Sequence, residues 1–157
     1  MDDVMAAQEH VALAWSLCDL YNHRQSDPAW LEKCLAAFAA DAEVIDVPSG
    51  ATLHGPDGLK RIALFFAENF PDMRTELTNV FATEDQITLE CTWRWNDTGH
   101  LYLTSGALPG MRRSGELRCC FVFQIRKGKI VSVHHYYDMM TLTEQLGLAP
   151  ATGQATE

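Results

Sequence analysis

The spacing of apolar residues changes once along the chain, close to Pro71. Before this residue, apolar side chains recur every three or four positions, a period typical of amphipathic helices. The period predicts helices over residues 4–24, 28–40 and about 56–70. The string Glu-Val-Ile-Asp-Val at residues 43–47 interrupts this pattern and predicts a short strand.

After Pro71, apolar and polar residues alternate, which is the period of strands with one buried face. The alternation predicts four strands, at residues 74–82, 87–95, 117–125 and 130–138. A short helix is expected after the last strand, at residues 139–146. Short turns favour a largely antiparallel sheet, and helices followed by strands indicate the α+β class. No repeat or linker divides the chain, so we expect one domain over residues 1–147 and a loose tail over residues 148–157.

Composition narrows the class of protein without naming a function. The chain has 157 residues, of which 47% are apolar, and this suits one folded domain and excludes wholesale disorder. No apolar run is long enough to span a membrane, and the first residues do not resemble a secretory signal, so a cytoplasmic location is expected. The net charge of −9 disfavours nucleic acid and anionic membranes as partners.

Neither the cysteines nor the histidines form a pattern typical of a disulfide framework or a metal site. The five cysteines include no Cys-x-x-Cys pair and are expected to be reduced, buried and unreactive. His134 and His135 are adjacent on a predicted strand, so they point to opposite faces and cannot share one ion. We therefore expect no metal.

Several short strings occur in an order that is characteristic of one protein family. They are Leu20-Tyr21-Asn22, Phe38-Ala39-Ala40-Asp41, His54-Gly55-Pro56-Asp57-Gly58, Phe70-Pro71-Asp72, Thr98-Gly99-His100, Gly128-Lys129-Ile130, Tyr137-Asp138 and Gln145-Leu146-Gly147. Over about residues 10–147 the chain resembles the SnoaL-like polyketide cyclase (ester cyclase) family, within the ketosteroid isomerase and nuclear transport factor superfamily.

The resemblance implies a cone-shaped α+β barrel, in which a strongly curved, mostly antiparallel sheet wraps around three N-terminal helices. Its open end is expected to lead to an apolar pocket. The implied function is acid/base catalysis without a cofactor on a small apolar or polyketide-like carbonyl compound. Removal of an α-proton would lead to ring closure or to isomerisation. A homodimer is also expected.

The resemblance assigns catalytic roles to Asp138, Asp46 and His100. Asp138 matches the family's general acid/base, and a carboxyl with a raised pKa in an apolar pocket can take and return a proton. The alternative is a solvated Asp138 that caps the helix at 139–146. Asp46 resembles the base of ketosteroid isomerases, or else forms the turn before Pro48. His100 matches a histidine of the family, or else lies in a solvent-exposed loop.

Six further side chains are expected to contact the substrate: Tyr21, Asn22, His134, Tyr136, Met139 and Trp93. Tyr21 and Asn22 either offer hydrogen bonds to a carbonyl oxygen or cap the first helix. His134 and Tyr136 share a strand face with Asp138, and Met139 would add a flexible apolar wall. Trp93 either lines the pocket or packs in the core or at a subunit contact.

Two other functions fit the same fold. One is a binding or interaction module without chemistry, because proteins of this fold need not be enzymes. The other is an epoxide hydrolase of the limonene type. Those enzymes use an Arg-x-Asp pair on the strand where this chain has Cys91 and Trp93, and the pair is absent. This makes the hydrolase the weaker alternative.

Overall fold

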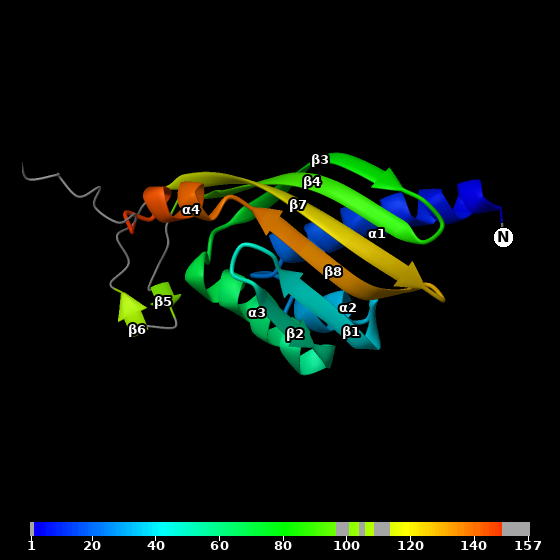
Figure 1. The fold of residues 1–157 in the computed structure, drawn as a ribbon, viewed down its shortest axis with the longest axis horizontal. Coiled ribbons are helices and arrows are strands. Elements are labelled where there is room, and N and C mark those ends of the chain that lie inside the picture. The colour runs from blue at the N-terminus through cyan, green and yellow to red at the C-terminus, as the bar shows by residue number, and fades with distance from the viewer. Residues whose placement is uncertain (1, 97–100, 104–105, 109–113, 149–157) are drawn as a thin grey trace, which may run out of the picture.

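A six-stranded sheet forms the body of the protein (Figure 1). The computed structural model describes residues 2–96, 101–103, 106–108 and 114–148. In the order in which they pair, the strands are β2 (Ala51–His54), β1 (Phe38–Asp46), β8 (Lys129–Tyr137), β7 (Gly115–Arg126), β4 (Gln86–Trp95) and β3 (Arg74–Ala82). All neighbours are antiparallel except β1 and β8, which run parallel. A separate pair of short strands, β5 (Leu101–Leu103) and β6 (Gly106–Leu108), completes the described strands.

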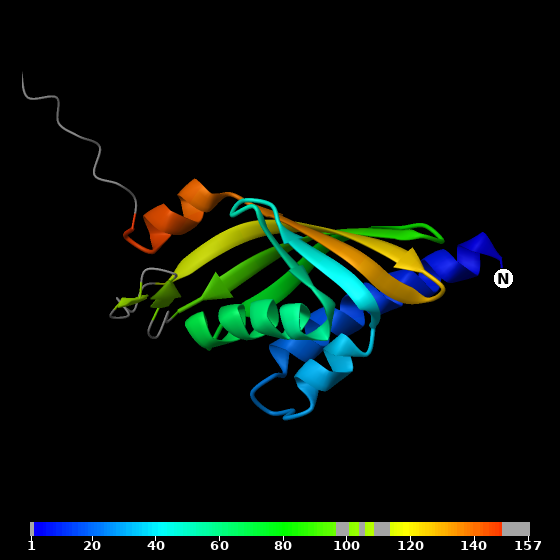
Figure 2. The ribbon, with the colours of Figure 1, turned by 60° about the horizontal axis from the view of Figure 1, so that its bottom comes forward.

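Helices cover one face of this sheet. The sheet arches over α1 (Asp3–Asn22), α2 (Trp30–Leu35) and α3 (Gly55–Asn69), as Figure 2 shows. The short helix α4 (Met139–Gln145) follows β8 at the end of the sheet, away from the other helices. No helix in the described ranges combines the length and the apolar character needed to cross a bilayer.

The α+β class is confirmed, but the architecture differs from the expected barrel in two ways. The sheet is open, because β2 and β3 are its edges and do not pair with each other. Two strands, β1 and β2, also stand between α2 and α3 in the chain, where the sequence predicted only the short strand at residues 43–47. The strand β2 was not predicted, since four residues are too few to display an alternating pattern.

The second predicted helix is much shorter than its sequence indicates. It was expected over residues 28–40, whereas α2 ends at Leu35 and β1 begins at Phe38. Backbone pairing explains the difference: the Ile130 amide donates to the carbonyl of Ala37, and Phe38 is in register with Ile130. The hydrogen bonds to β8 therefore override the helical preference of this alanine-rich segment.

The predicted alternation in the long strands is confirmed and builds the core. On β4 the buried apolar side chains are Ile87, Leu89, Cys91, Trp93 and Trp95. On β7 they are Leu117, Cys119, Phe123 and Ile125, with Phe121 packed against them. These side chains point to the concave face, where Phe66 of α3 meets them. The space that the helices leave against this face is the candidate site.

Candidate functional site

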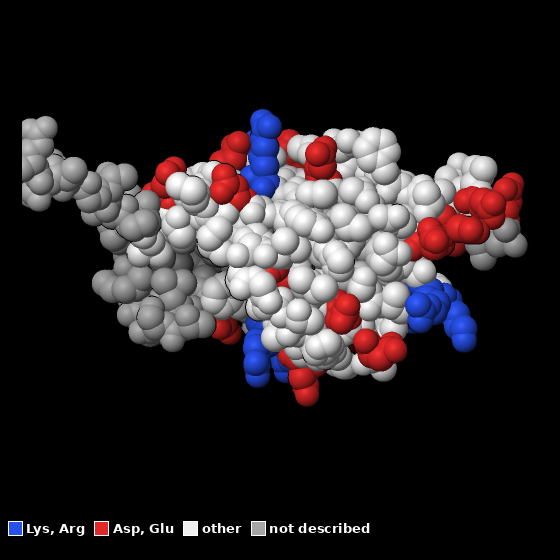
Figure 3. Space-filling view, viewed as in Figure 1, with Lys and Arg blue, Asp and Glu red and all other residues white. Residues whose placement is uncertain are grey.

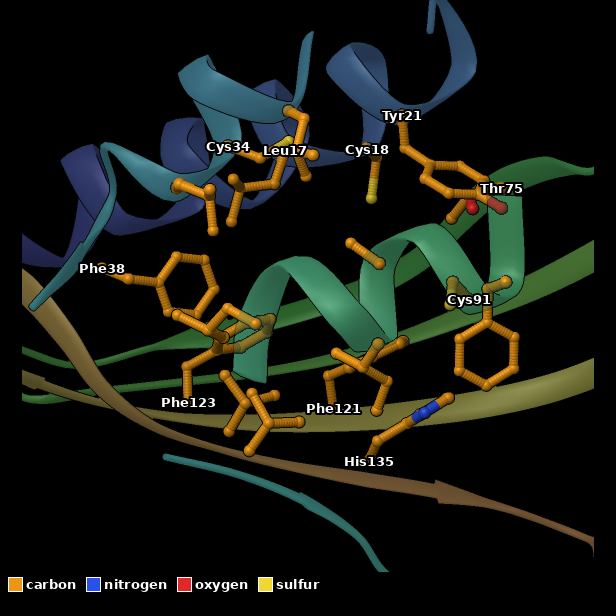
Figure 4. A pocket seen from close by; sticks show the side chains of 18 of the residues that line it. Leu17, Cys18, Tyr21, Cys34, Phe38, Thr75, Cys91, Phe121, Phe123 and His135 are labelled. Atoms are coloured by element: carbon orange, nitrogen blue, oxygen red, sulfur yellow. The ribbon is translucent and has the colours of Figure 1, made fainter. Parts of the chain in front are cut away.

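An apolar cavity of about 210 Å³ lies between the helices α1, α2 and α3 and the concave face of the sheet. Its lining comes from elements far apart in the sequence: Cys18 and Tyr21 from α1, Phe66 from α3, Trp93 from β4, Phe121 from β7 and His135 from β8. Figure 4 shows Tyr21 and Cys18 extending from the helices on one side and His135 from the sheet on the other. Polar groups in this lining are few, so each of them is a candidate for binding or chemistry.

A buried carboxylate stands at the end of β1. Ala42, Val44 and Asp46 alternate with less buried residues, so the two-residue period places Asp46 on the concave face. Its Oδ2 accepts a hydrogen bond from Tyr137 Oη at 3.0 Å and a short one from Ser49 Oγ. Its Oδ1 has no hydrogen-bond partner among the described residues. This free oxygen faces His135.

Asp46 and His135 are neighbours because β1 and β8 pair in parallel register, with these two residues opposite each other. The Nδ1 of His135 lies 3.6 Å from Asp46 Oδ1. This is longer than a hydrogen bond, but the nearby carboxylate favours the tautomer with a proton on Nδ1. In that tautomer Nε2 carries a lone pair. The structure gives Nε2 no hydrogen-bond partner among the described residues, although the atom is buried.

Aromatic rings surround the His135 imidazole. The ring stacks on Phe121 with centroids 4.1 Å apart and planes 6° apart, and Trp93 and Tyr137 lie at 5.0 and 4.7 Å. Only 2% of the residue is exposed, and this burial lowers the pKa of His135 to about 3. The imidazole is therefore neutral over the physiological range, and its Nε2 can accept a proton or a hydrogen bond.

Beside Thr75, Tyr21 brings a hydroxyl group to the lining of the cavity. Its hydroxyl is buried and has no hydrogen-bond partner in the described part of the chain. Burial raises the pKa of Tyr21 to about 12, so the hydroxyl stays protonated and can donate. Arg24 holds the ring in place: its guanidinium lies 4.2 Å from the ring centroid and donates to the carbonyls of Tyr21, Phe70, Pro71 and Met73.

Three thiols also line the cavity: Cys18, Cys34 and Cys91. Burial raises the pKa of Cys18 to about 12 and that of Cys34 to about 11. The pKa of Cys91 is raised as well, through the neighbouring thiol of Cys119 and burial. Thiols with raised pKa values are poor nucleophiles, so these cysteines contribute apolar surface rather than covalent chemistry.

Asp138 lies outside this cavity, at the N-terminus of α4. Its carboxylate accepts from the amides of Met140 and Thr141 and from the Thr141 hydroxyl. Those hydrogen bonds lower the pKa of Asp138, which is the reverse of the raised pKa that an acid/base residue in an apolar pocket would have. The geometry thus agrees with the capping alternative, and Asp138 does not line the cavity.

The other predicted contact residues divide into two groups. Tyr21 and Trp93 line the cavity. His134 and Tyr136 lie on the strand face opposite to His135, and Tyr136 is 42% exposed.

Asn22 pairs with the backbone of Thr75 through both its amide nitrogen and its oxygen, which joins α1 to β3. Met139 packs against the core without lining the cavity. His100 lies outside the described residues.

Three residues of the site escaped the sequence-based prediction: His135, Tyr137 and Ser49. A register shift in the pairing of β7 with β8 lies between Ile130 and Ser132, so Ile130 shares the concave face with Val133, His135 and Tyr137. The signal in the sequence that could have placed His135 on the buried face was Val133, because this apolar residue lies two positions away and therefore on the same face of the strand. Among the described residues, no group of three or more possible ligands is arranged to hold a metal ion.

Solved structures with the same fold include three bacterial proteins. A proposed SnoaL-like polyketide cyclase from Jannaschia sp. CCS1 has a TM-score of 0.80 at 13% identity, covering 96% of this chain and 99% of that one. AclR, a proposed hydroxylase from Streptomyces galilaeus, has a TM-score of 0.73 at 16% identity over 94% and 91% of the two chains. IdmH, a proposed polyketide cyclase from Streptomyces antibioticus, has a TM-score of 0.65 at 21% identity over 85% and 95%.

These likenesses are structural, and at such low identity they establish the fold alone. Among curated proteins, none matches this chain in sequence. The family assignment comes from the sequence itself, because the pattern of the SnoaL-like domain matches residues 21–133, which is most of the chain. The matched region runs from Tyr21 to Val133 and includes Asp46. The chain belongs to the SnoaL-like domain family.

Proposed function

We propose that this protein is an acid/base enzyme of the cyclase or isomerase type that uses no cofactor and acts on a small apolar carbonyl compound. The proposal rests mainly on one observation: the neutral imidazole of His135 lines an apolar cavity, its buried Nε2 has no hydrogen-bond partner among the described residues, and the carboxylate of Asp46 lies on its Nδ1 side. A base backed by a carboxylate and shielded from water is the arrangement that proton abstraction from carbon requires.

In the proposed mechanism, His135 Nε2 removes a proton from the carbon next to the substrate carbonyl. The imidazolium that forms is stabilised by Asp46, whose other oxygen is held by Tyr137 and Ser49. The hydroxyl of Tyr21 donates to the oxygen on which negative charge develops. Return of the proton to another carbon completes an isomerisation. In a ring closure the enolate carbon attacks a second carbonyl of the same molecule, and the imidazolium returns its proton to the alkoxide that forms.

This proposal keeps Asp46 in the site but gives it a positioning role, and it moves the acid/base role from Asp138 to His135. The Asp46 carboxylate already accepts two hydrogen bonds and does not line the cavity, whereas His135 does. The lowered pKa of His135 also limits the chemistry. A weak base removes protons at a useful rate only from activated positions, because each pKa unit of mismatch adds about 1.4 kcal/mol to the proton transfer.

The test is hydrogen–deuterium exchange at an activated carbon. The probe is 2-indanone, whose α-protons are also benzylic, and exchange in heavy water is followed by proton NMR. We expect the wild-type protein to accelerate exchange over buffer and His135→Gln to lose at least about a hundredfold of that acceleration, the usual share of a general base. Asp46→Asn should lose at least about tenfold, because the imidazolium then lacks its counter-charge.

Two matched variants serve as controls for this test. His134→Gln changes the neighbouring histidine on the other strand face, and Asp138→Asn keeps a capping side chain. Both should exchange at the wild-type rate. Exchange by His135→Gln within threefold of wild type would overturn the proposal, and a large loss in Asp138→Asn would return the acid/base role to that residue. Absence of exchange by the wild type would favour the binding-module alternative.

The proposal also includes pairing with a second copy of the chain through the convex face of the sheet. Cys120 and Val122 of β7 lie opposite Tyr136 and His134 of β8 there, and we call these four residues the convex patch. They are partly exposed, and Figure 3 shows few charged side chains in the middle of this face. An uncharged sheet face flanked by charges suits an isologous contact between identical subunits.

A further inference from the structure

Two residues in the largely apolar lining of the cavity, Tyr21 and His135, each carry a buried polar atom without a hydrogen-bond partner among the described residues, and this restricts what the cavity can hold. We infer that the site takes small, flat, uncharged ring compounds that present a phenolic or enolic hydroxyl, with about eight to ten non-hydrogen atoms. This inference rests on the proposed function, because it concerns the same cavity and names the class of compound that enters it. The size, shape, charge and hydrogen-bonding pattern of the cavity each set one of these limits.

The volume of the cavity sets the size of the ligand. In another protein, an engineered apolar cavity of about 150 Å³ holds benzene, with six carbon atoms. In proportion, a cavity of 210 Å³ holds a compound of about eight to ten non-hydrogen atoms. Sites for drug-sized ligands range from about 300 to 1,000 Å³. A single ring with substituents or a small fused pair of rings therefore fits, whereas a compound of three or four fused rings does not.

The walls of the cavity favour a flat ligand. Phe66, Trp93 and Phe121 meet around His135, and Tyr21 closes the cavity from the helical side. Rings of this kind contact another ring through stacked or edge-to-face geometry, and they gain contact area with little loss of side-chain freedom. A planar ligand uses these faces more fully than a flexible chain of equal size.

Charge excludes anionic and cationic ligands. None of the described residues that line the cavity is Lys, Arg, Asp or Glu. The one basic side chain among the described lining residues, His135, is neutral because burial lowers its pKa to about 3. A carboxylate or ammonium group would lose its hydration here without meeting an opposite charge. An uncharged compound avoids this loss.

Hydrogen bonding selects for a hydroxyl. His135 Nε2 is an acceptor when Nδ1 holds its proton toward Asp46, and the Tyr21 hydroxyl is free to donate. A phenol or enol donates its O–H to Nε2, and its oxygen or a nearby carbonyl accepts from Tyr21. A hydrocarbon of the same shape leaves both buried atoms unpaired, which we expect to weaken binding by about tenfold or more.

Four compounds test the inference by isothermal titration calorimetry with the full chain. They are indan-5-ol, indane, indane-5-carboxylate and phenanthren-9-ol. We expect indan-5-ol to bind at least tenfold more tightly than indane, because only the phenol pairs with Nε2. Indane-5-carboxylate should bind at least a hundredfold more weakly than indan-5-ol, and phenanthren-9-ol should give no binding heat because it exceeds the cavity.

Two variants locate the effect at the proposed atoms. His135→Phe replaces the imidazole with another ring in the aromatic cage, and Tyr21→Phe removes only the hydroxyl. In each variant the preference for indan-5-ol over indane should fall to threefold or less, while indane binds as it does to the wild type. Binding of indane also reports that the variant is folded. Should one variant fail to fold, the other still gives the comparison.

Three results would overturn the inference. They are an unchanged preference for indan-5-ol in both variants, binding of the carboxylate within tenfold of the phenol, and no binding of any of the four compounds. Failure of the proposed function remains distinguishable, since binding requires no turnover. The expected binding pattern without deuterium exchange would leave this inference standing and remove the enzyme proposal. Deuterium exchange without a preference for the phenol would leave the enzyme proposal standing and remove this inference.

Discussion

Burial of the His135 ring makes the stability of the whole protein depend on pH. The pKa of His135 falls to about 3 in the folded protein, whereas an unfolded chain has the ordinary value near 6.5. Between these values the unfolded chain binds a proton that the folded protein does not. The contribution of His135 is therefore fully present above about pH 6.5 and is lost as the pH falls toward 3. Full titration over this window amounts to at most about 5 kcal/mol.

We expect the urea midpoint of the wild type to fall steeply between pH 6.5 and 3, and that of His135→Phe to fall much less. The measurement is urea unfolding, followed by circular dichroism at steps of half a pH unit. The two proteins differ only at position 135, so the difference between the curves isolates His135. Parallel curves for the two proteins would contradict the burial argument.

Residue patterns predicted part of this site and missed the rest for a definable reason. Tyr21 and Asp46 were named as candidates because the strings that carry them resemble the family, and Trp93 because it lies on the apolar face of a predicted strand. His135 was not, because the family resemblance drew attention to the strand face of Asp138. The face of the sheet on which a histidine lies depends on the register of its strand. A shift of one residue in that register moves every side chain of the strand to the other face. Register in β8 is set by its partners β1 and β7, which no local pattern reveals.

At the scale of elements, the spacing of apolar residues and the positions of proline and glycine predicted most of the fold. The strand β3 begins and ends where the alternation placed it, at Arg74 and Ala82, and α3 agrees within a residue at each end. The errors lie where pairing over long distance competes with local preference. Residues 38–40 join β1 because β8 offers backbone partners, and the short β2 exists because it completes a hairpin with β1.

The N-cap of α4 provides a test that separates the two interpretations of Asp138. Asp138→Ala removes three hydrogen bonds from the helix terminus, so the melting temperature should fall by several degrees. Asp138→Asn should retain most of the stability, because asparagine caps helices nearly as well. Thermal unfolding of the three proteins at pH 7 measures the difference.

The same hydrogen bonds lower the pKa of Asp138, the largest share coming from the Thr141 hydroxyl. Its contribution to stability is therefore present above the ordinary aspartate pKa and is lost as the pH falls below it. The gap in stability between wild type and Asp138→Ala should narrow at acid pH. An equal loss of stability in the Asn and Ala variants would argue against capping.

At the scale of the whole molecule, the two faces of the sheet have different roles in our proposals. The concave face holds the cavity, and the convex patch contacts a second copy. Sedimentation equilibrium should then give a mass near 35 kDa, twice the 17.6 kDa of one chain. Val122→Arg places a charge in the patch and should shift the protein to 17.6 kDa, because an unpaired buried charge is costly at an interface.

Ala12→Arg is the matched control for the dimer, since Ala12 is exposed on α1, away from the convex face. This variant should sediment as the wild type does. Both arginine variants should keep their helical and strand signals in circular dichroism. A wild-type protein that sediments as a single chain at all concentrations would remove the dimer from the proposal.

Because β1 and β8 are far apart in the chain, their pairing also determines at what stage of folding the site forms. Asp46 and Tyr137, which share a hydrogen bond, are 91 positions apart in the chain. During synthesis the carboxylate leaves the ribosome long before the strand that carries His135 and Tyr137. Contacts between such distant segments form slowly, because a large loop must close first. The rate at which ligand binding recovers during refolding therefore reports the last long-range step of folding. The rate at which the helical signal recovers reports earlier steps.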